Sequence, residues 1–272
     1  MTSKLENALQ RAREEGRGGG TGSDADFTPG YGNRSLRRRE DHRRAIASMD
    51  EGPLHTAEFL DERRIIHPGM NQPEVANRFR ELRTRLFELR PTGNFSLMVT
   101  SVVPSGGATF TGLNLAAAIA LDQSRTSLMI DANLSEPRLQ EILDLRPELG
   151  LADYLEDDTL EVARILHTSG IPRLRVIPMG RRREGAAEFF TSARMHRFME
   201  DVQSRYPDRY VVVDAPALSE SADARILADL CDYVLLVVPY GRVTRPQMEQ
   251  AVASVGSERL AGVVMNDEPT WD

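Results

Sequence analysis

The chain is almost without lysine: of its 34 basic residues, Lys4 is the one lysine and all the others are arginines. Cys231, inside the apolar run LCDYVLLVV, is the one cysteine, which excludes an internal disulfide and favours a reducing compartment. No apolar run approaches the ~20 residues that a membrane helix needs, and the N-terminus shows no signal-peptide pattern. The five histidines are scattered without metal-ligand spacing. These absences predict a cytoplasmic protein that has neither a disulfide nor a histidine metal site.

The totals fit one α/β domain of about 200 residues with an appendage. Hydrophobic residues make up 40% of the 272 residues, which is enough for a sizeable core, and the formal net charge is −7. A chain with this excess of acidic residues is not expected to bind nucleic acid through its bulk charge.

Residues 1–72 are predicted to be a flexible, partly helical N-terminal segment. Apolar residues recur at helical spacing over residues 4–15, which indicates a short amphipathic helix that either frays or docks on a partner. Residues 16–33 are rich in glycine and indicate a linker. The basic run RSLRRREDHRR that follows is either a solvated charged segment or a contact with an anionic membrane surface. A second short helix is expected over residues 56–66.

Residues 73–93 are predicted to link this segment to the main domain through an amphipathic helix. The helix itself is expected over residues 74–90, because Pro91 and Gly93 follow as stop signals. Arginines cover much of the rest of its surface. Its apolar stripe consists of Val75, Phe79, Leu82, Leu86 and Leu89.

Residues 94–272 are predicted to be a P-loop NTPase-like domain, because strand and helix patterns alternate throughout. This alternation favours a mainly parallel sheet with helices on both faces. Ligands of such sheets bind at the carboxyl ends of the strands. Four expected strands end in this way at Asp131, Asp214, Pro239 and Asn266.

The stretch FSLMVTS, VVPSGGATFTG, LNLAAAIAL indicates a strand, a glycine turn and a helix. A P-loop uses such a turn to surround phosphate oxygens with backbone N–H groups at a helix N-terminus. The lysine that reaches the β and γ phosphates in that motif is replaced by Ala108. An arginine could add charge, but its planar fork fits a tight loop differently from an ammonium group. The nucleotide-binding residues expected in the loop are Ser105, Gly106, Gly107, Ala108, Thr109 and Phe110.

Two carboxylates are candidates for a magnesium site. Asp131 and Asp214 each close an apolar strand beside the glycine loop, where an aspartate can hold Mg²⁺ and its waters. A single strand-end aspartate more often caps the following turn. Two such residues in a fold with a phosphate loop favour a shared site, to which Thr109 could add its hydroxyl.

From about residue 73 to residue 266 the chain resembles the bacterial tyrosine autokinases of capsule and exopolysaccharide systems, the BY-kinases, whose fold is related to that of MinD and ParA. The resemblance is carried by FRELRTRL, VTSVVPSGGATFTGLNLA, SLMIDANLSEPRL, YVVVDAPALSESADARILADLCDYVLLVVPYGRVTR and LAGVVMN. It implies that Asp131 is the Walker A′ aspartate and Asp214 the Walker B aspartate. It also implies that Asn266 helps to bind the adenine, and that Mg·ATP or Mg·ADP is the cofactor.

The chain departs from the family pattern at several functional positions. Ala108 replaces the loop lysine, Asn133 replaces the second Walker A′ acid, and Ser135 replaces a common basic residue. The family's tyrosine-rich tail is missing, because only DEPTWD follows Asn266. In the family's E-x-x-R-x-x-R subunit motif, Arg80 and Arg83 match and are the expected contacts of a homo-oligomer, but Asn77 takes the glutamate position.

Three functions follow from these residues. The first is a degenerate, pseudokinase-like component of exopolysaccharide or capsule production, with weak or lost Mg·nucleotide binding. It would bind a membrane polysaccharide co-polymerase or an active kinase paralogue at the cytoplasmic face of the inner membrane. The second is an active tyrosine autokinase or ATPase in which an arginine such as Arg138 compensates for the lysine. The third is a MinD- or ParA-like positioning ATPase, against which the stretch GRRREGAAEFFTSARM counts.

Overall fold

The structure is a computed structural model that describes residue 46 and residues 48–134, 136–180 and 187–267. These residues belong to one compact unit. The predicted domain boundary at residue 72 stays a prediction. The expected helix at residues 4–15, the glycine-rich linker and the basic run lie outside the described residues. None of the helices that the structure describes combines the length and apolar character needed to cross a bilayer.

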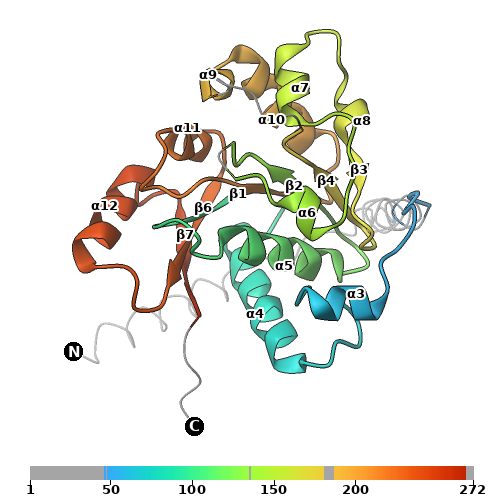
Figure 1. The fold of residues 1–272 in the computed structure, drawn as a ribbon, viewed down its shortest axis with the longest axis horizontal. Helices are drawn as coiled ribbons and strands as arrows, with labels where there is room; N and C mark the ends of the chain where they lie inside the picture. Colours follow the sequence, from blue (N-terminus) through green and yellow to red (C-terminus); the bar gives the residue numbers. More distant parts are fainter. Residues whose placement is uncertain (1–45, 47, 135, 181–186, 268–272) are drawn as a thin grey trace, which may run out of the picture. The chain divides into compact units, whose positions relative to one another are not determined.

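The sheet in the described part of the chain has seven strands in the order β3-β4-β2-β5-β1-β6-β7 (Figure 1). Neighbouring strands are parallel except for β3, which pairs antiparallel with β4. The predicted mainly parallel sheet is therefore confirmed, and the two-residue strand β3 is an addition that its sequence did not reveal. The strands are β1 (Ser96–Ser101), β2 (Thr126–Asp131), β3 (His167–Thr168), β4 (Leu174–Ile177), β5 (Arg209–Asp214), β6 (Tyr233–Pro239) and β7 (Leu260–Asn266).

Helices cover both faces of this sheet, as the alternating pattern predicted (Figure 1). One core cluster packs α3, α4 and α5 on one face, and the other packs α7, α9, α10, α11 and α12 on the opposite face. Strands β1, β2, β4 and β5 are buried along their whole length, which explains their near-continuous apolar runs. The helices are α3 (Ala57–Glu62), α4 (Pro73–Leu89), α5 (Ala108–Ala120), α6 (Leu139–Ile142), α7 (Leu151–Glu156), α8 (Val162–Ile165), α9 (Ala187–Phe190), α10 (Ala193–Ser204), α11 (Asp223–Asp229) and α12 (Arg245–Val255).

The segment before α4 packs tightly on the domain. Helix α3 is shorter than the predicted helix over residues 56–66, because it ends at Glu62. Ile65 and Ile66 follow it as non-helical residues that are fully buried, and the Ile66 N–H donates to Asn114 Oδ1 at 2.8 Å. The two isoleucines therefore pack into the hydrophobic core and do not extend the helix.

Helix α4 lies where the amphipathic stripe predicted it, with one difference at its end. Leu86 is buried as expected, but Leu89, in the last turn, is 44% exposed. Phe87 takes the packing position instead, with ring centroids 4.8 Å from Tyr210 and 6.2 Å from Phe95.

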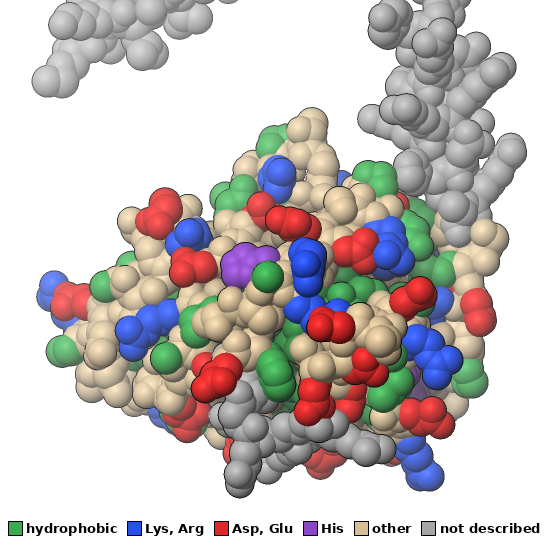
Figure 2. Space-filling model, turned by 90° about the horizontal axis from the view of Figure 1, so that it is seen from above, with side chains coloured by type: hydrophobic (Ala, Val, Ile, Leu, Met, Phe, Trp, Pro, Cys, Tyr) green, Lys and Arg blue, Asp and Glu red, His purple; other side chains and the backbone are tan. Residues whose placement is uncertain are grey.

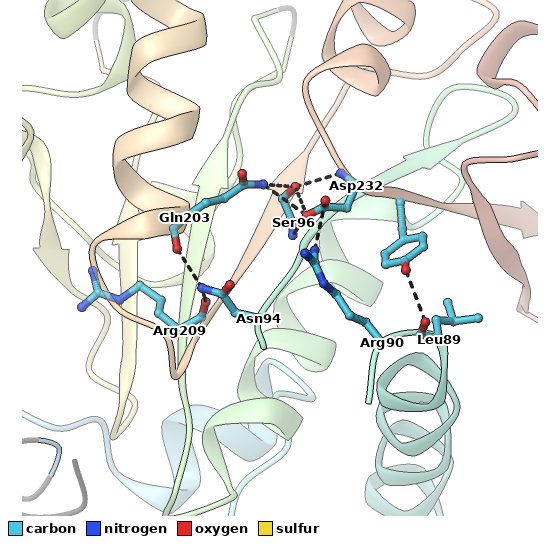
Figure 3. A network of polar contacts seen from close by, with 8 residues as sticks. Leu89, Arg90, Asn94, Ser96, Gln203, Arg209 and Asp232 are labelled. Carbon is cyan, nitrogen blue, oxygen red and sulfur yellow. Dashed lines mark hydrogen bonds and ion pairs between the residues drawn. The ribbon is translucent and has the colours of Figure 1, made fainter. Parts of the chain in front are cut away.

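A polar network at the amino end of β1 ties α4 to the sheet (Figure 3). Ser96 and Asp232 bind each other reciprocally: the Ser96 N–H donates to Asp232 Oδ2 at 2.8 Å, and the Asp232 N–H donates to Ser96 Oγ at 2.9 Å. Gln203 on α10 donates to the same Ser96 oxygen, and Arg90, just after α4, pairs with Asp232 at 3.2 Å. The network connects one helix from each face of the sheet to β1.

Asn94 adds a second connection beside this network (Figure 3). Its Nδ2 lies within 2.9 Å of three backbone carbonyl oxygens, those of Gln203, Tyr206 and Arg209. The first of these belongs to the last turn of α10, whose carbonyl groups lack partners within the helix. Asn94 therefore fastens the end of α10 and the start of β5 to the strand entry.

Charged side chains of both signs are mixed on the face over α7, α9 and α10 (Figure 2). On α10 they form ion pairs, Arg205 with Asp201 at 2.7 Å and Arg194 with Asp158 at 2.9 Å. A mixed surface of this kind differs from the continuous basic stripe that a nucleic-acid-binding face presents.

Candidate functional site

A cleft of about 780 Å³ opens at the carboxyl ends of β1 and β5, against the start of α5. All six loop residues predicted to bind nucleotide, residues 105–110, line it. The strand-end rule therefore located the cleft correctly in the fold. Its other lining residues are Ser101, Pro104, Asn133, Glu136, Arg138, Ile142, Ala215, Ala217 and Glu220.

The loop backbone has the shape of an anion cradle. Ser105 has φ 52° and Gly107 has φ 90°, both in the left-handed region that recurs in backbone nests for anions. A Cβ atom on Gly107 would meet the amide end of the Asn266 side chain, which would have to move, while the φ of 90° favours glycine by itself. Helix α5 begins at the next residue and points its N-terminus at the cleft.

The two candidate carboxylates are neighbours. Asp131 on β2 pairs in register with Asp214 on β5, and both residues are fully buried. Thr109 Oγ1 donates to Asp214 Oδ2 at 2.6 Å, while the backbone N–H groups of Asn133 and Leu139 donate to the Asp131 carboxylate at 3.1 and 3.2 Å. The structure thus brings together the three predicted metal ligands.

Burial changes the acidity of this pair. It raises the pKa of Asp131 from 3.8 to about 6, against the lowering effect of its backbone hydrogen bonds. It raises the pKa of Asp214 still more clearly, and the neighbouring charge of Asp131 adds to the rise. Asp214 Oδ1 is buried and has no hydrogen-bond partner. A buried carboxylate oxygen without a partner among the described residues fits a role as a cation ligand.

Magnesium fits this donor set. Mg²⁺ takes oxygen ligands and keeps several waters, so two carboxylates and a threonine hydroxyl suit it when phosphate oxygens complete the shell. Within the described ranges no group of three or more His, Cys, Asp or Glu side chains gathers into a metal cluster. The pair is therefore suited to a metal that arrives with a phosphate ligand.

The cleft is poor in cations at the position where a P-loop has its lysine. Ala108, the first residue of α5, is only 8% exposed and packs into the core on the α5 face. Arg138, the predicted substitute, does line the cleft, but its Nη2 lies 3.3 Å from Glu136 Oε2. Glu220 adds another acid to the lining. Among the described residues that line the cleft, two acidic side chains thus stand against one basic side chain.

Asn266 has a different contact from the one expected of an adenine-binding residue. It ends β7, and its Nδ2 donates to Gly106 O at 3.2 Å. The side chain is therefore directed at the phosphate loop.

The predicted oligomer residues lie away from the cleft, on α4. Arg80 Nη1 donates to Asn77 Oδ1 at 2.9 Å, so the residue in the glutamate position binds within the helix. Arg83 Nη1 donates to Ala118 O, in the last turn of α5, at 2.7 Å. Whether these arginines also contact another subunit stays a prediction.

Arg242 is a site residue that the sequence analysis missed. It follows β6 by three residues, and its guanidinium donates to Ser105 O and Pro104 O, both at 3.0 Å. The rule that points to Pro239 at this strand end would also have found Arg242, if the connection after the strand had been considered.

Comparisons with curated proteins give a consistent relationship, although no protein-family model matches the chain. The chain is 30% identical over 190 residues to EpsB of Ralstonia solanacearum and 28% identical over 204 residues to tyrosine-protein kinase YwqD of Bacillus subtilis. It is 29% identical over 175 residues to succinoglycan biosynthesis transport protein ExoP of Rhizobium meliloti. These matches cover 69%, 73% and 62% of this chain, and 25%, 84% and 22% of the three relatives. The chain thus spans most of YwqD but about a quarter or less of EpsB and ExoP.

Solved structures agree on the fold. The kinase domain of Escherichia coli tyrosine kinase ETK matches with a TM-score of 0.67 at 24% identity, over 85% of this chain and 96% of that domain. The cell division ATPase MinD of Pyrococcus furiosus matches with a TM-score of 0.53 at 18% identity, over 62% of this chain and 70% of that protein. The predicted P-loop NTPase-like fold, related to MinD, is confirmed.

Proposed function

Because this chain is a homologue of the bacterial tyrosine-protein kinases and has the fold of their kinase domains, we propose that it is a degenerate, kinase-like regulator in exopolysaccharide or capsule production. It transfers phosphate poorly or not at all. It acts by binding, with a weakened site for Mg·ATP or Mg·ADP.

One observation carries the proposal: the residue that should present an ammonium group to the phosphates is a buried alanine, Ala108. In phosphoryl transfer the protein contributes mainly positioning and electrostatic stabilisation, so a missing cation acts directly on the transition state. Removing a single preorganised stabilising group from an active site typically slows the reaction by about 10²–10³. No lysine elsewhere in the domain can replace it, since Lys4 is the one lysine of the chain.

The rest of the site supports retained but weak binding. The cradle of residues 105–107, the N-terminus of α5 and the pair Asp131 and Asp214 are all in place. Backbone N–H groups and a bound Mg²⁺ can hold phosphate oxygens without a lysine. The Asp131 and Asp214 carboxylates would hold the metal and Thr109 would orient it, while the metal would supply charge neutralisation on the phosphates.

An active kinase or ATPase is the second candidate, because Arg138 lines the same cleft. For catalysis its guanidinium would have to leave Glu136 and turn to the phosphates. A Glu136→Gln variant removes the ion pair that holds Arg138. If the protein is an active enzyme that uses Arg138, phosphate transfer or hydrolysis should be faster in this variant than in wild type.

Two measurements separate the candidates. Purified wild type, Ala108→Lys and Asp131→Ala are each titrated with Mg·ADP by calorimetry and incubated with γ-labelled ATP and Mg²⁺. The proposal expects weak nucleotide binding in wild type, at least tenfold tighter binding in Ala108→Lys, and no labelled tyrosine in wild type. Label on a wild-type tyrosine that disappears in Asp131→Ala would establish the kinase instead.

The partner that we propose is a membrane protein of polysaccharide assembly or an active kinase paralogue, on the cytoplasmic side of the membrane. It is supported by the likeness to ExoP, which is named for succinoglycan biosynthesis and transport. Crosslinking with the full chain in cells, followed by identification of the captured membrane protein, tests this; capture of neither class contradicts it.

A further inference from the structure

Arg242 binds the phosphate loop from a position outside the cleft. Its planar guanidinium donates to two consecutive carbonyl oxygens, Pro104 O and Ser105 O, at 3.0 Å each. The forked geometry of arginine suits such a pair of acceptors, which a lysine ammonium could not bind in the same way. Arg242 lies on the connection between β6 and α12, so it fixes the loop to a different part of the sheet.

Two other side chains hold the carbonyl groups on either side. Ser101 Oγ donates to Val103 O at 2.7 Å, and Asn266 Nδ2 donates to Gly106 O at 3.2 Å. Four consecutive carbonyl oxygens of the loop, those of residues 103–106, therefore each accept a hydrogen bond from a side chain.

Fixing these oxygens also fixes the direction of the N–H groups. In a trans peptide the N–H points away from the C=O of the same plane, and the described residues contain no cis peptide. The N–H groups of Ser105, Gly106 and Gly107 thus point away from the side chains that hold the loop. Within the described part of the chain they donate to no backbone carbonyl. They remain available to a ligand in the cleft that these residues line.

The loop conformation needs this external support. Ser105 has φ 52°, a region that residues with a side chain rarely adopt. The carbonyl group of Ser105 is one of the two that Arg242 binds. Ser105, the residue with the unfavourable φ, is therefore hydrogen-bonded directly to Arg242, the side chain that holds it.

We propose that Arg242 is a positioning residue that, together with Asn266, holds the phosphate loop in its anion-binding form, and that the anion is the terminal phosphate group of a nucleotide. This rests on the proposed function, since it takes the cleft to be a nucleotide site. Without the loop lysine, the backbone N–H groups supply a larger share of the phosphate contacts, so their orientation matters more here. Arg242 does not replace the lysine, because its guanidinium binds the outer oxygens of the loop.

The test compares Arg242→Gln with Arg245→Gln. Arg245 lies three residues further on, at the start of α12, where its side chain is 90% exposed and pairs with Glu249 at 2.8 Å. Both variants lose one positive charge from the same region, but only the first loses the contact with the loop. The third variant is Arg242→Lys, which keeps the positive charge but loses the planar guanidinium that binds two carbonyl oxygens at once.

The first readout needs no ligand. Backbone ¹⁵N relaxation in the free protein reports the order parameters of Ser105, Gly106 and Gly107, which are about 0.85 in rigid backbone and below about 0.6 in flexible backbone. Arg242→Gln should lower them to the flexible range, Arg242→Lys should lie in between, and Arg245→Gln should leave them unchanged. The melting temperature should stay within about 2–3 °C of wild type in all three variants. Equal order parameters in Arg242→Gln and Arg245→Gln would overturn the proposal.

The second readout is Mg·ADP affinity, measured by calorimetry in the Ala108→Lys background. Arg242→Gln should weaken it about tenfold and Arg245→Gln less than twofold; equal losses would show a general charge effect and overturn the proposal. If Ala108→Lys alone binds no Mg·ADP, the proposed nucleotide site fails. The relaxation measurement then still decides whether Arg242 holds the loop.

Discussion

Replacing Asp214 by asparagine should make the ligand-free protein more stable at alkaline pH. Asp214 is fully buried beside Asp131, and its Oδ1 has no hydrogen-bond partner. Asparagine keeps the shape, and its side-chain oxygen can still accept from Thr109, which now donates to Asp214 Oδ2 at 2.6 Å. The substitution thus removes a buried charge and keeps the contact that supports it.

The size of the effect follows from the cost of that charge. Leaving a buried charge uncompensated costs roughly 3–5 kcal/mol. The rise in the pKa of Asp131 from 3.8 to about 6 is of similar size, about 3 kcal/mol at 1.36 kcal/mol per pKa unit. For a domain of 150–250 residues, each kcal/mol moves the melting temperature by about 2–4 °C. Asp214→Asn should therefore raise the melting temperature at pH 8 by roughly 6–20 °C.

The gain should depend on pH, with a definite sign. The folded pKa of Asp214 is raised above its unfolded value, so the folded wild type binds more protons than the unfolded chain in the window above pH 3.8. Stability of the wild type falls as pH rises through that window, which for Asp131 extends to about 6. Below the window the protonated acid and the amide are nearly equivalent. The difference between variant and wild type should therefore be smallest at pH 4.5, near the lower end of the window, and grow toward pH 8.

Thermal unfolding followed by circular dichroism, in EDTA from pH 4.5 to pH 8, measures this difference. Asp158→Asn is the control, because Asp158 is 88% exposed and its pair with Arg194 is a surface pair worth at most about 1 kcal/mol. Added Mg·ADP should stabilise wild type and have little effect on Asp214→Asn. A variant that is less stable than wild type at pH 8, or a difference that does not change with pH, would refute the assignment of Asp214 as a destabilising buried anion.

Three further substitutions test the framework around the cleft. Asn94→Ala removes a side chain that binds three carbonyl oxygens and should cost about 2 kcal/mol in a denaturant titration. Gly107→Ala should disturb the loop, because φ is 90° and a Cβ atom would lie 2.2 Å from Asn266 Nδ2; calorimetry in the Ala108→Lys background should show at least tenfold weaker Mg·ADP binding. Arg83→Gln should lower the unfolding free energy by about 1–3 kcal/mol, because the last turn of α5 loses the donor to Ala118 O.

Each of these has a matched control in the chain. Asn71→Ala removes one exposed hydrogen bond to Asp61, and Gly262→Ala adds a Cβ atom that meets nothing within 4 Å. Arg85→Gln removes an arginine of α4 that pairs with Glu81 on an exposed surface. If a control matches its test variant, the contact named for that variant does not account for the effect. Light scattering on Arg83→Gln also shows whether the residue supports an oligomer.

Local sequence patterns predicted which residues gather at the site, but they did not predict the hydrogen bonds that hold these residues in place. The glycine turn predicted the loop that lines the cleft, and the strand ends predicted that Asp131 and Asp214 lie side by side next to Thr109, because parallel strands bring their carboxyl ends to one edge. The contact of Arg242 with Ser105 O joins residues 137 positions apart, and no local pattern encodes it. The predicted apolar stripe of α4 wrongly included Leu89 for a similar reason, since the end of that helix is fixed by partners elsewhere in the fold.

Strand β3 and the buried Ile65 and Ile66 show a second limit of prediction from the sequence. β3 has two residues, His167 and Thr168, which is too short for an alternating pattern to be visible. Ile65 and Ile66 continue the helical pattern of α3 by composition, but core packing beyond Glu62 takes them out of the helix. Tertiary contacts override local propensity at such element ends.

The packing of residues 48–72 decides where the protein can be shortened. A fragment cut at residue 94, just before the first strand, would lose the two isoleucines from its interior and expose an apolar groove along α5. It would also remove the Ile66 N–H, which now donates to the amide oxygen of Asn114. The carbonyl of Asp50 accepts from Arg175 and the Glu51 carboxylate accepts from the Arg173 N–H, so even a cut at residue 52 would strip both partners from β4 and its approach. The smallest recombinant piece that keeps these contacts therefore begins upstream of Asp50.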